Sequence, residues 1–190
     1  MDKNIKFNLL KEARELFIKK GFKSTGIREI AKKTGVATGT LYNYYDSKED
    51  IFLDIFLEEN DQLNKEIIKS LNIEEQSLKI LKKAISNHLE KIEENPILKV
   101  MFETEVRDKV LSKLKPNKYK KYTESTRDTF IPYIKNMQDK GIVKNIDPEF
   151  FIIVINTIYN VNINKKEYGE EYFPMLTEFL IEAIINNLKK

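Results

Sequence analysis

Apolar residues recur at the spacing of an α-helix along nearly the whole chain, and this periodicity constrains the fold more than any other feature. In the first such segment Ile5, Leu9 and Ala13 follow one another at four-residue intervals, and Gly21 ends the segment. This spacing places the apolar side chains on one face of a helix, and glycine commonly terminates helices. The 190 residues include only 6 glycines and 5 prolines, which is few for a turn-rich β fold. We therefore expect an all-α protein of about nine helices.

The expected helices follow one another with short connections and without a flexible linker. The helix that begins at Ser47 has Asp50 three residues later, which is the spacing of a capping box. Pro132 lies inside a later helix and is expected to kink or break it. The periodicity places the helices at 5–20, 27–34, 38–44, 47–71, 75–94, 97–114, 118–140, 148–165 and 170–188.

The composition argues against several kinds of chemistry. The chain has no cysteine, which excludes a disulfide scaffold, a Cys-ligated zinc site and a cysteine nucleophile. It has one histidine, His88, and neither a glycine-rich phosphate loop nor a cluster with metal-ligand spacing. We therefore expect no cofactor, no metal and no enzymatic activity. An acid–base enzyme that uses His88 and Glu105 remains as a less favoured alternative.

Apolar runs are short, and the positive charge is concentrated near the N-terminus. The longest apolar run, FFIIVI at 150–155, is well below the roughly 18 residues that span a membrane. We expect a cytoplasmic protein without a membrane partner. Residues 1–50 hold 11 Lys and Arg against 7 Asp and Glu, whereas residues 51–190 hold 22 against 23. A basic end favours a polyanionic partner, and lysine-rich solvated helices are the alternative.

Residues 27–45, IREIAKKTGVATGTLYNYY, have the spacing of a helix-turn-helix. The small Ala31 allows two helices to cross closely, Gly35 suits the turn between them, and Leu41 anchors the second helix to the core. The outward face carries no acid, so it can enter a DNA major groove. An ordinary surface helix, or a helix that binds a protein in an adaptor, is the alternative. The outward residues are Thr38, Gly39, Thr40, Tyr42 and Asn43.

The segment GFKSTGIREIAKKTGVATGTLYNYYDSKEDIF closely resembles the N-terminal helix-turn-helix of TetR-type bacterial transcriptional repressors. The resemblance covers residues from about 5 to 60. It implies a homodimer that binds a near-palindromic double-stranded operator and is released from it by a small-molecule effector. Residues 1–46 are then the DNA-binding domain, with the helix-turn-helix at 26–45, and residues 47–190 bind the ligand and dimerise. Gly26 and Tyr45 depart from the family pattern, which has Ser or Thr and Phe there.

The resemblance also implies roles for individual residues. Arg28 is expected to read guanine, and Lys48 to add charge beside a phosphate. Tyr42 and Tyr44 are expected to contact phosphates, with packing in the core as the alternative. Thr25 or Ser24 is expected to supply the hydroxyl that Gly26 lacks. The expected DNA-binding residues are Thr25, Arg28, Thr38, Gly39, Thr40, Tyr42, Asn43, Tyr44 and Lys48.

The three expected helices between residues 75 and 140 each turn a mostly apolar face with a few polar groups inward, which is how a ligand cavity is composed. The segment HLEKIEENPILKVMFETEVR loosely resembles the body of family members that respond to fatty acyl-CoA. A lipophilic ligand with a polar head is therefore one interpretation, and an amphipathic cation facing Glu105 is another. Plain core packing, with Glu105 paired to His88 or in solvent, is the alternative. The expected pocket residues are His88, Phe102, Glu105, Tyr122, Thr126 and Tyr133.

The expected helix at 148–165 is apolar almost all the way round, and the one at 170–188 has a broad apolar face. A small protein buries such helices on both sides, which favours a self-complementary dimer interface. A monomer core is the alternative. The expected interface residues are Ile155, Tyr159, Phe179 and Ala183.

Overall fold

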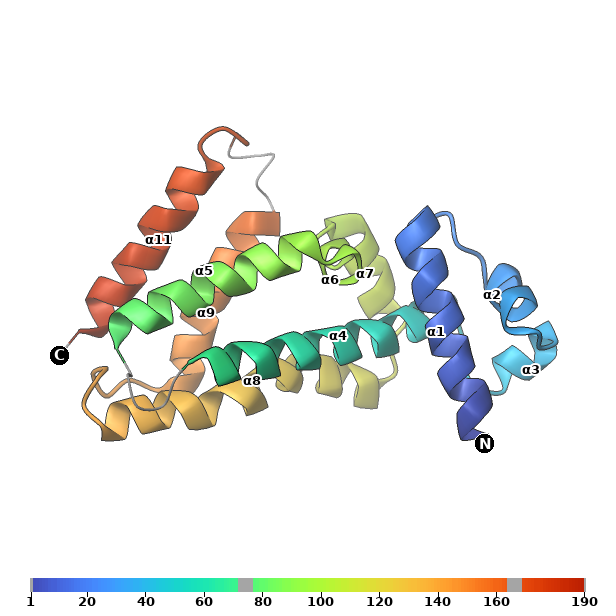
Figure 1. Cartoon of the computed structure of the whole chain (residues 1–190), viewed down its shortest axis with the longest axis horizontal. Helices are drawn as coiled ribbons and strands as arrows, with labels where there is room; N and C mark the ends of the chain where they lie inside the picture. Colours follow the sequence, from blue (N-terminus) through green and yellow to red (C-terminus); the bar gives the residue numbers. More distant parts are fainter. Residues whose placement is uncertain (1, 72–76, 164–168, 190) are drawn as a thin grey trace. The chain divides into compact units, whose positions relative to one another are not determined.

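The computed structural model describes residues 2–71, 77–163 and 169–189, which form ten α-helices and no strand (Figure 1). The all-α prediction with about nine helices is confirmed. The helices are α1 (Lys3–Lys20), α2 (Ile27–Thr34), α3 (Thr38–Tyr42), α4 (Lys48–Ser70), α5 (Leu78–Glu94), α6 (Pro96–Val100), α7 (Thr104–Ser112), α8 (Pro116–Asp139), α9 (Pro148–Ile163) and α11 (Phe173–Leu188). Among the described helices, none is long and apolar enough to cross a membrane.

The prediction of a single helix over 97–114 is wrong. The structure has α6 and α7 there, separated by residues 101–103. Asn95 caps α6, because its side-chain oxygen accepts from the N–H groups of Ile97 (2.9 Å) and Leu98 (3.1 Å). An interruption changes the helical phase, so a periodicity counted from Ile97 no longer indicates which way Glu105 faces.

Glycines end α1 and α2 as the sequence predicts. Gly21 has φ 79° and its N–H donates to the Phe17 carbonyl at 2.9 Å. Gly35 has φ 77° in the left-handed region and forms the turn between α2 and α3. A side chain at either position would be strained by the positive φ. The turn of the helix-turn-helix therefore depends on Gly35.

The chain forms two compact units, which we call unit 1 and unit 2. Unit 1 contains the residues up to Asn60 together with Asn95–Tyr122, and unit 2 contains Asp61–Glu94 together with the residues from Thr123 onward. Helices α4 and α8 each contribute residues to both units. This division describes packing, and a functional boundary at residue 46 remains a prediction.

An aromatic cluster forms part of the core of unit 1. The rings of Phe17 and Phe22 lie 5.3 and 4.9 Å from the ring of Phe52 in α4, both in edge-on contact. All three side chains are buried, as is Leu41 of α3. Burial of each such side chain stabilises the fold by about 1.5–3 kcal/mol. The cluster joins α1 and the segment that follows it to α4.

Unit 2 is built from α5, α9, α11 and the later parts of α4 and α8. Helix α11 contacts α5 and α9, and the Lys144 N–H donates to the Leu188 carbonyl at 3.0 Å. Helix α8 continues through Pro132, so of the two expected effects, a kink or a break, the break does not occur. Ile134 and Met137, which follow it, are buried.

Candidate nucleic-acid interface and ligand cavity

Helices α2 and α3 present a polar face because their apolar residues are held in the core. Ile30 and Ala31 of α2 and Leu41 of α3 are at most 1% exposed. On the other side of the two helices, Arg28, Gly39, Tyr42 and Asn43 are exposed, and Thr38, Thr40 and Tyr44 are half-buried. We call these seven residues the α2–α3 face.

Two cations of α2 are left unpaired among the described residues, whereas Lys33 pairs with Glu12 and Glu15 and the acid of the helix is neutralised. Glu29 forms an ion pair with Lys20. Within the described ranges, Arg28 and Lys32 are exposed and their side chains have no ion-pair or hydrogen-bond partner. Lys32 follows Arg28 by four residues, which puts both on one side of the helix. Sequence analysis did not select Lys32, although this spacing was a signal.

Lys48 holds the loop between α1 and α2. Its ammonium donates to the carbonyls of Phe22 (2.8 Å), Lys23 (3.2 Å) and Thr25 (2.8 Å), and it lies 4.6 Å from the centroid of the Phe22 ring. An ammonium has three N–H donors, and all three are used here. Partial burial lowers the pKa of this half-buried group. The expected phosphate contact is therefore corrected: in this structure Lys48 binds backbone oxygens.

Thr25 is also an internal residue. Its side chain is 2% exposed, and its hydroxyl donates to the Gly21 carbonyl at 2.9 Å. The single O–H of this side chain is therefore occupied, and the expectation that it contacts a phosphate is corrected. Carbonyls at the end of a helix lack partners within the helix. The position of Thr25 four residues after Gly21, which ends α1, was the sequence feature that indicated this hydrogen bond.

The three neighbouring tyrosines have different environments. Tyr42 is 51% exposed, which argues against packing in the core. Tyr44 is half-buried and its hydroxyl accepts the Asp2 N–H at 3.2 Å. Tyr45 is 2% exposed and its hydroxyl donates to Asp54 at 3.1 Å. Burial and the Asp54 charge raise the pKa of Tyr45.

A cluster of charges ties α8 to α4 and α1. The Lys118 ammonium lies 2.6 Å from Asp50 and 2.9 Å from Asp54, and Lys6 lies 3.3 Å from Asp54. Lys118 also lies 5.3 Å from the centroid of the Tyr45 ring. Burial acts to raise the pKa of Asp54, but the hydrogen bond and charge of Lys118, with Lys6, hold that pKa below its ordinary value. Sequence analysis missed this cluster, because its members are far apart in the chain.

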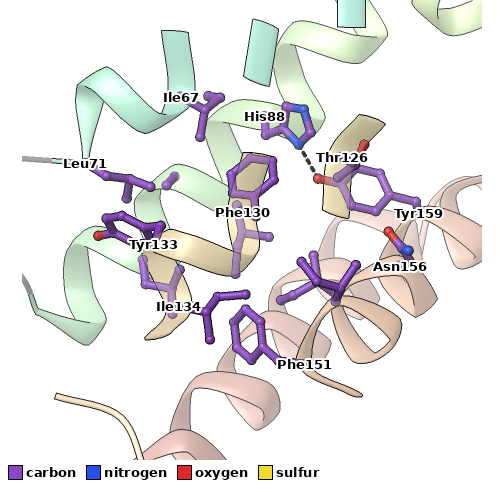
Figure 2. Close-up of a pocket in the computed structure, with 15 residues that line it drawn as sticks. Ile67, Leu71, His88, Thr126, Phe130, Tyr133, Ile134, Phe151, Asn156 and Tyr159 are labelled. Atoms are coloured by element: carbon purple, nitrogen blue, oxygen red, sulfur yellow. Dashed lines mark hydrogen bonds between the residues drawn. The ribbon is translucent and has the colours of Figure 1, made fainter. Parts of the chain in front are cut away.

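Unit 2 contains a cavity between α4, α5, α8 and α9 (Figure 2). The space that it encloses is about 50 Å³, and the wider hollow around it, which includes open solvent, is about 550 Å³. Three of the expected pocket residues line it, namely His88, Thr126 and Tyr133. Phe130, Asn156 and Tyr159 also line it and were not expected there.

His88 and Tyr159 form a buried polar pair in the cavity wall. A hydrogen bond joins His88 Nδ1 and the Tyr159 hydroxyl (Figure 2), and the His88 side chain is 6% exposed. Burial lowers the pKa of His88 to about 4 and raises the pKa of Tyr159. Both groups are therefore neutral at neutral pH. His88 Nε2 is buried and has no hydrogen-bond partner among the residues that the structure describes.

The other three expected pocket residues do not line the cavity. The Glu105 side chain is 78% exposed and pairs with Lys23, whose hydrogen bond and charge lower the pKa of the carboxyl. Phe102 and Tyr122 belong to unit 1, where the Tyr122 ring lies 5.9 Å from the ring of Phe56. The break between α6 and α7 at 101–103 explains why Glu105 faces solvent. The acid–base alternative lacks its pair, because His88 bonds to Tyr159 and Glu105 to Lys23.

Two of the expected dimer residues face inward. Ile155 and Tyr159 line the cavity, and their place at a dimer interface remains a prediction. Phe179 is 66% exposed, and Ala183 is half-buried. An all-round apolar helix gives no periodic signal that separates its inner face from its outer face. The exposed large apolar side chains of α9 and α11 are Phe150, Ile153, Met175 and Phe179.

The chain is similar in sequence to bacterial regulators. Residues 9–55 match the sequence profile of the bacterial regulatory proteins of the tetR family. The chain is 23% identical over 176 residues to the uncharacterized HTH-type transcriptional regulator YvkB of Bacillus subtilis, covering 92% of this chain and 89% of YvkB. It is 41% identical over 70 residues to the HTH-type transcriptional regulator QacR of Staphylococcus aureus, covering 35% of this chain and 37% of QacR.

Solved structures share the fold. FadR of Thermus thermophilus, a TetR-family repressor in complex with lauroyl-CoA, matches with a TM-score of 0.70 and 22% identity, over 96% of this chain and 92% of that chain. FadR of Bacillus subtilis in complex with stearoyl-CoA matches with a TM-score of 0.66 and 19% identity, over 95% of this chain and 98% of that chain.

Proposed function

The chain belongs to the tetR family of bacterial regulatory proteins, and from this premise we propose that it is a cytoplasmic, homodimeric repressor controlled by a small-molecule effector. The α2–α3 face carries the proposal, because it combines a cation, Arg28, that is unpaired among the described residues with hydroxyl, amide and aromatic groups and contains no acid. Such a face suits a major groove, where base edges offer hydrogen-bond partners and phosphates attract cations.

Individual residues of the α2–α3 face suit different parts of the duplex. The Arg28 guanidinium, exposed and unpaired, is suited to bidentate recognition of guanine. Thr38, Thr40 and Asn43 suit base edges or thymine methyl groups, and the Tyr42 hydroxyl suits a phosphate. A Cβ added at Gly39 would meet no protein atom within 4 Å. The packing of the protein therefore does not require glycine there, whereas close approach of a duplex would.

A homodimer would cover the exposed apolar residues of α9 and α11. Phe150, Ile153, Met175 and Phe179 are each between 56% and 67% exposed in the single chain. Large exposed apolar side chains gathered on neighbouring helices favour an interface with another protein surface. A twofold interface would pair two copies of the α2–α3 face and lead to a near-palindromic operator.

Two continuous helices give the cavity a route to the α2–α3 face. Helix α4 begins with Lys48 at the loop before α2 and contributes Ile67 to the cavity. Helix α8 holds Asp50 and Asp54 through Lys118 and contributes Phe130 to the cavity. A ligand that shifts either helix would move the DNA-binding residues. The coupling free energy between ligand binding and DNA binding would then be about 1–3 kcal/mol. The acyl-CoA complexes of the two FadR structures support a lipid-like effector.

Selection of duplexes from a random pool, followed by gel shifts over a range of salt concentrations, tests the proposal. We expect enrichment of a near-palindrome and affinity that falls steeply as salt rises. Arg28→Ala should weaken binding to the selected duplex, whereas Lys79→Ala, which removes one charge from exposed α5 surface, should not. If no duplex is enriched, the protein-binding adaptor becomes the better interpretation.

A further inference from the structure

We propose that the cavity of unit 2 takes an uncharged ligand that is mostly hydrocarbon and carries one hydrogen-bonding oxygen, such as an ester, a ketone or an alcohol, which binds at His88. The proposal rests on the proposed function only in treating this ligand as the effector. It chooses between the two ligand classes that the sequence left open, and it follows from the charges, polar groups and shape of the cavity wall.

The described part of the cavity wall offers no charge to a ligand. Among the described residues that line it, none is a lysine, an arginine, an aspartate or a glutamate. His88 is neutral at neutral pH, because burial lowers its pKa to about 4. Moving an ion from water into such an environment without a counter-charge is strongly unfavourable. The cavity therefore discriminates against carboxylate and ammonium groups alike.

The hydrogen-bonded pair of His88 and Tyr159 leaves one nitrogen, His88 Nε2, to which a ligand can hydrogen-bond. When the Tyr159 O–H donates to His88 Nδ1, the proton of the neutral imidazole lies on Nε2. This nitrogen is buried and has no hydrogen-bond partner in the described part of the chain. Buried donors are almost always paired in folded proteins. A carbonyl or hydroxyl oxygen of a ligand would complete this one.

The polar and apolar side chains of the wall are separated in space. Figure 2 shows His88, Thr126, Asn156 and Tyr159 on one side of the cavity. The opposite side is hydrocarbon and aromatic, with the Tyr133 hydroxyl directed away from His88 (Figure 2). A molecule with one polar end and a hydrocarbon body fits this division. The apolar side includes Leu71, Ile134 and Phe151.

The amphipathic cation lacks its expected partner. Glu105 lies at the surface, pairs with Lys23 and does not line the cavity. An anionic fatty acid likewise meets no cation among the described residues of the wall. An acyl thioester satisfies the same chemistry through its neutral carbonyl, provided that its charged carrier lies outside the cavity.

Four compounds with ten-carbon chains and different head groups test the proposal on the full chain. Titration calorimetry at neutral pH compares 1-decanol, methyl decanoate, decanoate and decyltrimethylammonium, each below its micelle concentration. We expect the alcohol and the ester to bind at least about ten-fold more tightly than the two ions, since each ten-fold step corresponds to about 1.4 kcal/mol. This comparison uses the unaltered protein, so it does not depend on whether a variant folds.

Variants then locate the polar end. His88→Leu and Tyr159→Phe should weaken methyl decanoate binding by about ten-fold and about three-fold, as expected for loss of one hydrogen bond and of the group that orients it. Tyr133→Phe is the matched control, because it removes a hydroxyl from the opposite side of the same cavity. Its affinity should remain within about two-fold of wild type.

The outcomes separate this inference from the proposed function. Decanoate or decyltrimethylammonium binding as tightly as the ester would overturn the inference and leave a DNA-binding regulator in place. So would a protein that binds its selected duplex but neither neutral compound. Tight binding of the neutral compounds by a protein that binds no duplex would support the inference and contradict the proposed function.

Discussion

Replacement of Lys48 by arginine should destabilise the protein although the charge is kept. The Lys48 ammonium donates to three carbonyls from residues 22–25 that converge on one point. A guanidinium is planar and larger, and its N–H groups diverge in one plane. It cannot donate to all three oxygens from the same position. A residue that only contacted a phosphate would tolerate this change.

The size of the effect follows from the three bonds. A hydrogen bond to a charged donor contributes about 1.5–3 kcal/mol when buried. Two of the bonds, both 2.8 Å long, are partly buried and the third is exposed, so solvent screening reduces their sum considerably. We expect Lys48→Met to lose about 2 kcal/mol, and Lys48→Arg about 1 kcal/mol. For a chain of this length, 1 kcal/mol corresponds to a fall of about 2–4 °C in Tm.

Thermal unfolding of wild type, Lys48→Met and Lys48→Arg at one protein concentration measures these losses. The concentration is fixed because an oligomer's Tm depends on it. Anisotropy titrations with the selected duplex, run in parallel, report DNA affinity. If Lys48→Arg kept the wild-type Tm and affinity while Lys48→Met lost only affinity, Lys48 would be a phosphate contact and our assignment to the loop would be refuted.

Four further predictions concern other parts of the molecule. Arg28→Ala should cost about 1–3 kcal/mol on the selected duplex and relax base preference at one position of each half-site, which a duplex series with single-base changes would measure. The folded state keeps His88 neutral down to pH about 4, whereas the unfolded chain takes up a proton below pH about 6.5, so stability is lost as pH falls between these values. Wild type should lose about 2 kcal/mol more than His88→Leu between pH about 7 and about 4.5 in urea unfolding. Phe179→Glu should give a monomeric mass by light scattering at micromolar concentration, and an unchanged dimer would exclude the α11 face from the interface. Lys118→Met should cost about 2 kcal/mol in urea unfolding, because it leaves two partly buried carboxylates with less counter-charge; no loss would show that the cluster is unimportant for stability.

The helix-turn-helix could be predicted because its determinants are local. Ala31, Gly35 and Leu41 lie within eleven residues, and each acts through its own size or backbone freedom. The structure bears out the turn at Gly35 and the burial of Leu41. What the sequence could not indicate is which donors are already in use. From the sequence, Lys48 and Thr25 both look like residues that bind a phosphate. In the structure Lys48 donates to the carbonyl of Thr25, which is 23 residues away along the chain, and Thr25 donates to the carbonyl of Gly21, four residues away.

The cavity was only partly predictable, because it depends on helical phase and on which side of a helix faces inward. The periodicity of α5 and α8 was uninterrupted, and His88, Thr126 and Tyr133 line the cavity as expected. Glu105 was misplaced because nothing in the sequence marked the break at 101–103. Tyr159 was expected at the dimer interface and not in the cavity wall, because α9 is apolar almost all the way round and its periodicity does not separate its faces.

The most direct test of the account measures whether the cavity controls the DNA-binding face. Anisotropy titrations of the wild-type protein with its selected duplex, with and without saturating methyl decanoate, give the change in operator affinity. Calorimetry of methyl decanoate with and without the duplex gives the change in ligand affinity. Because coupling between two sites is reciprocal, we predict that each ligand weakens the other by the same factor, about 5- to 150-fold. Methyl decanoate that binds in the cavity and leaves operator affinity unchanged would contradict the account.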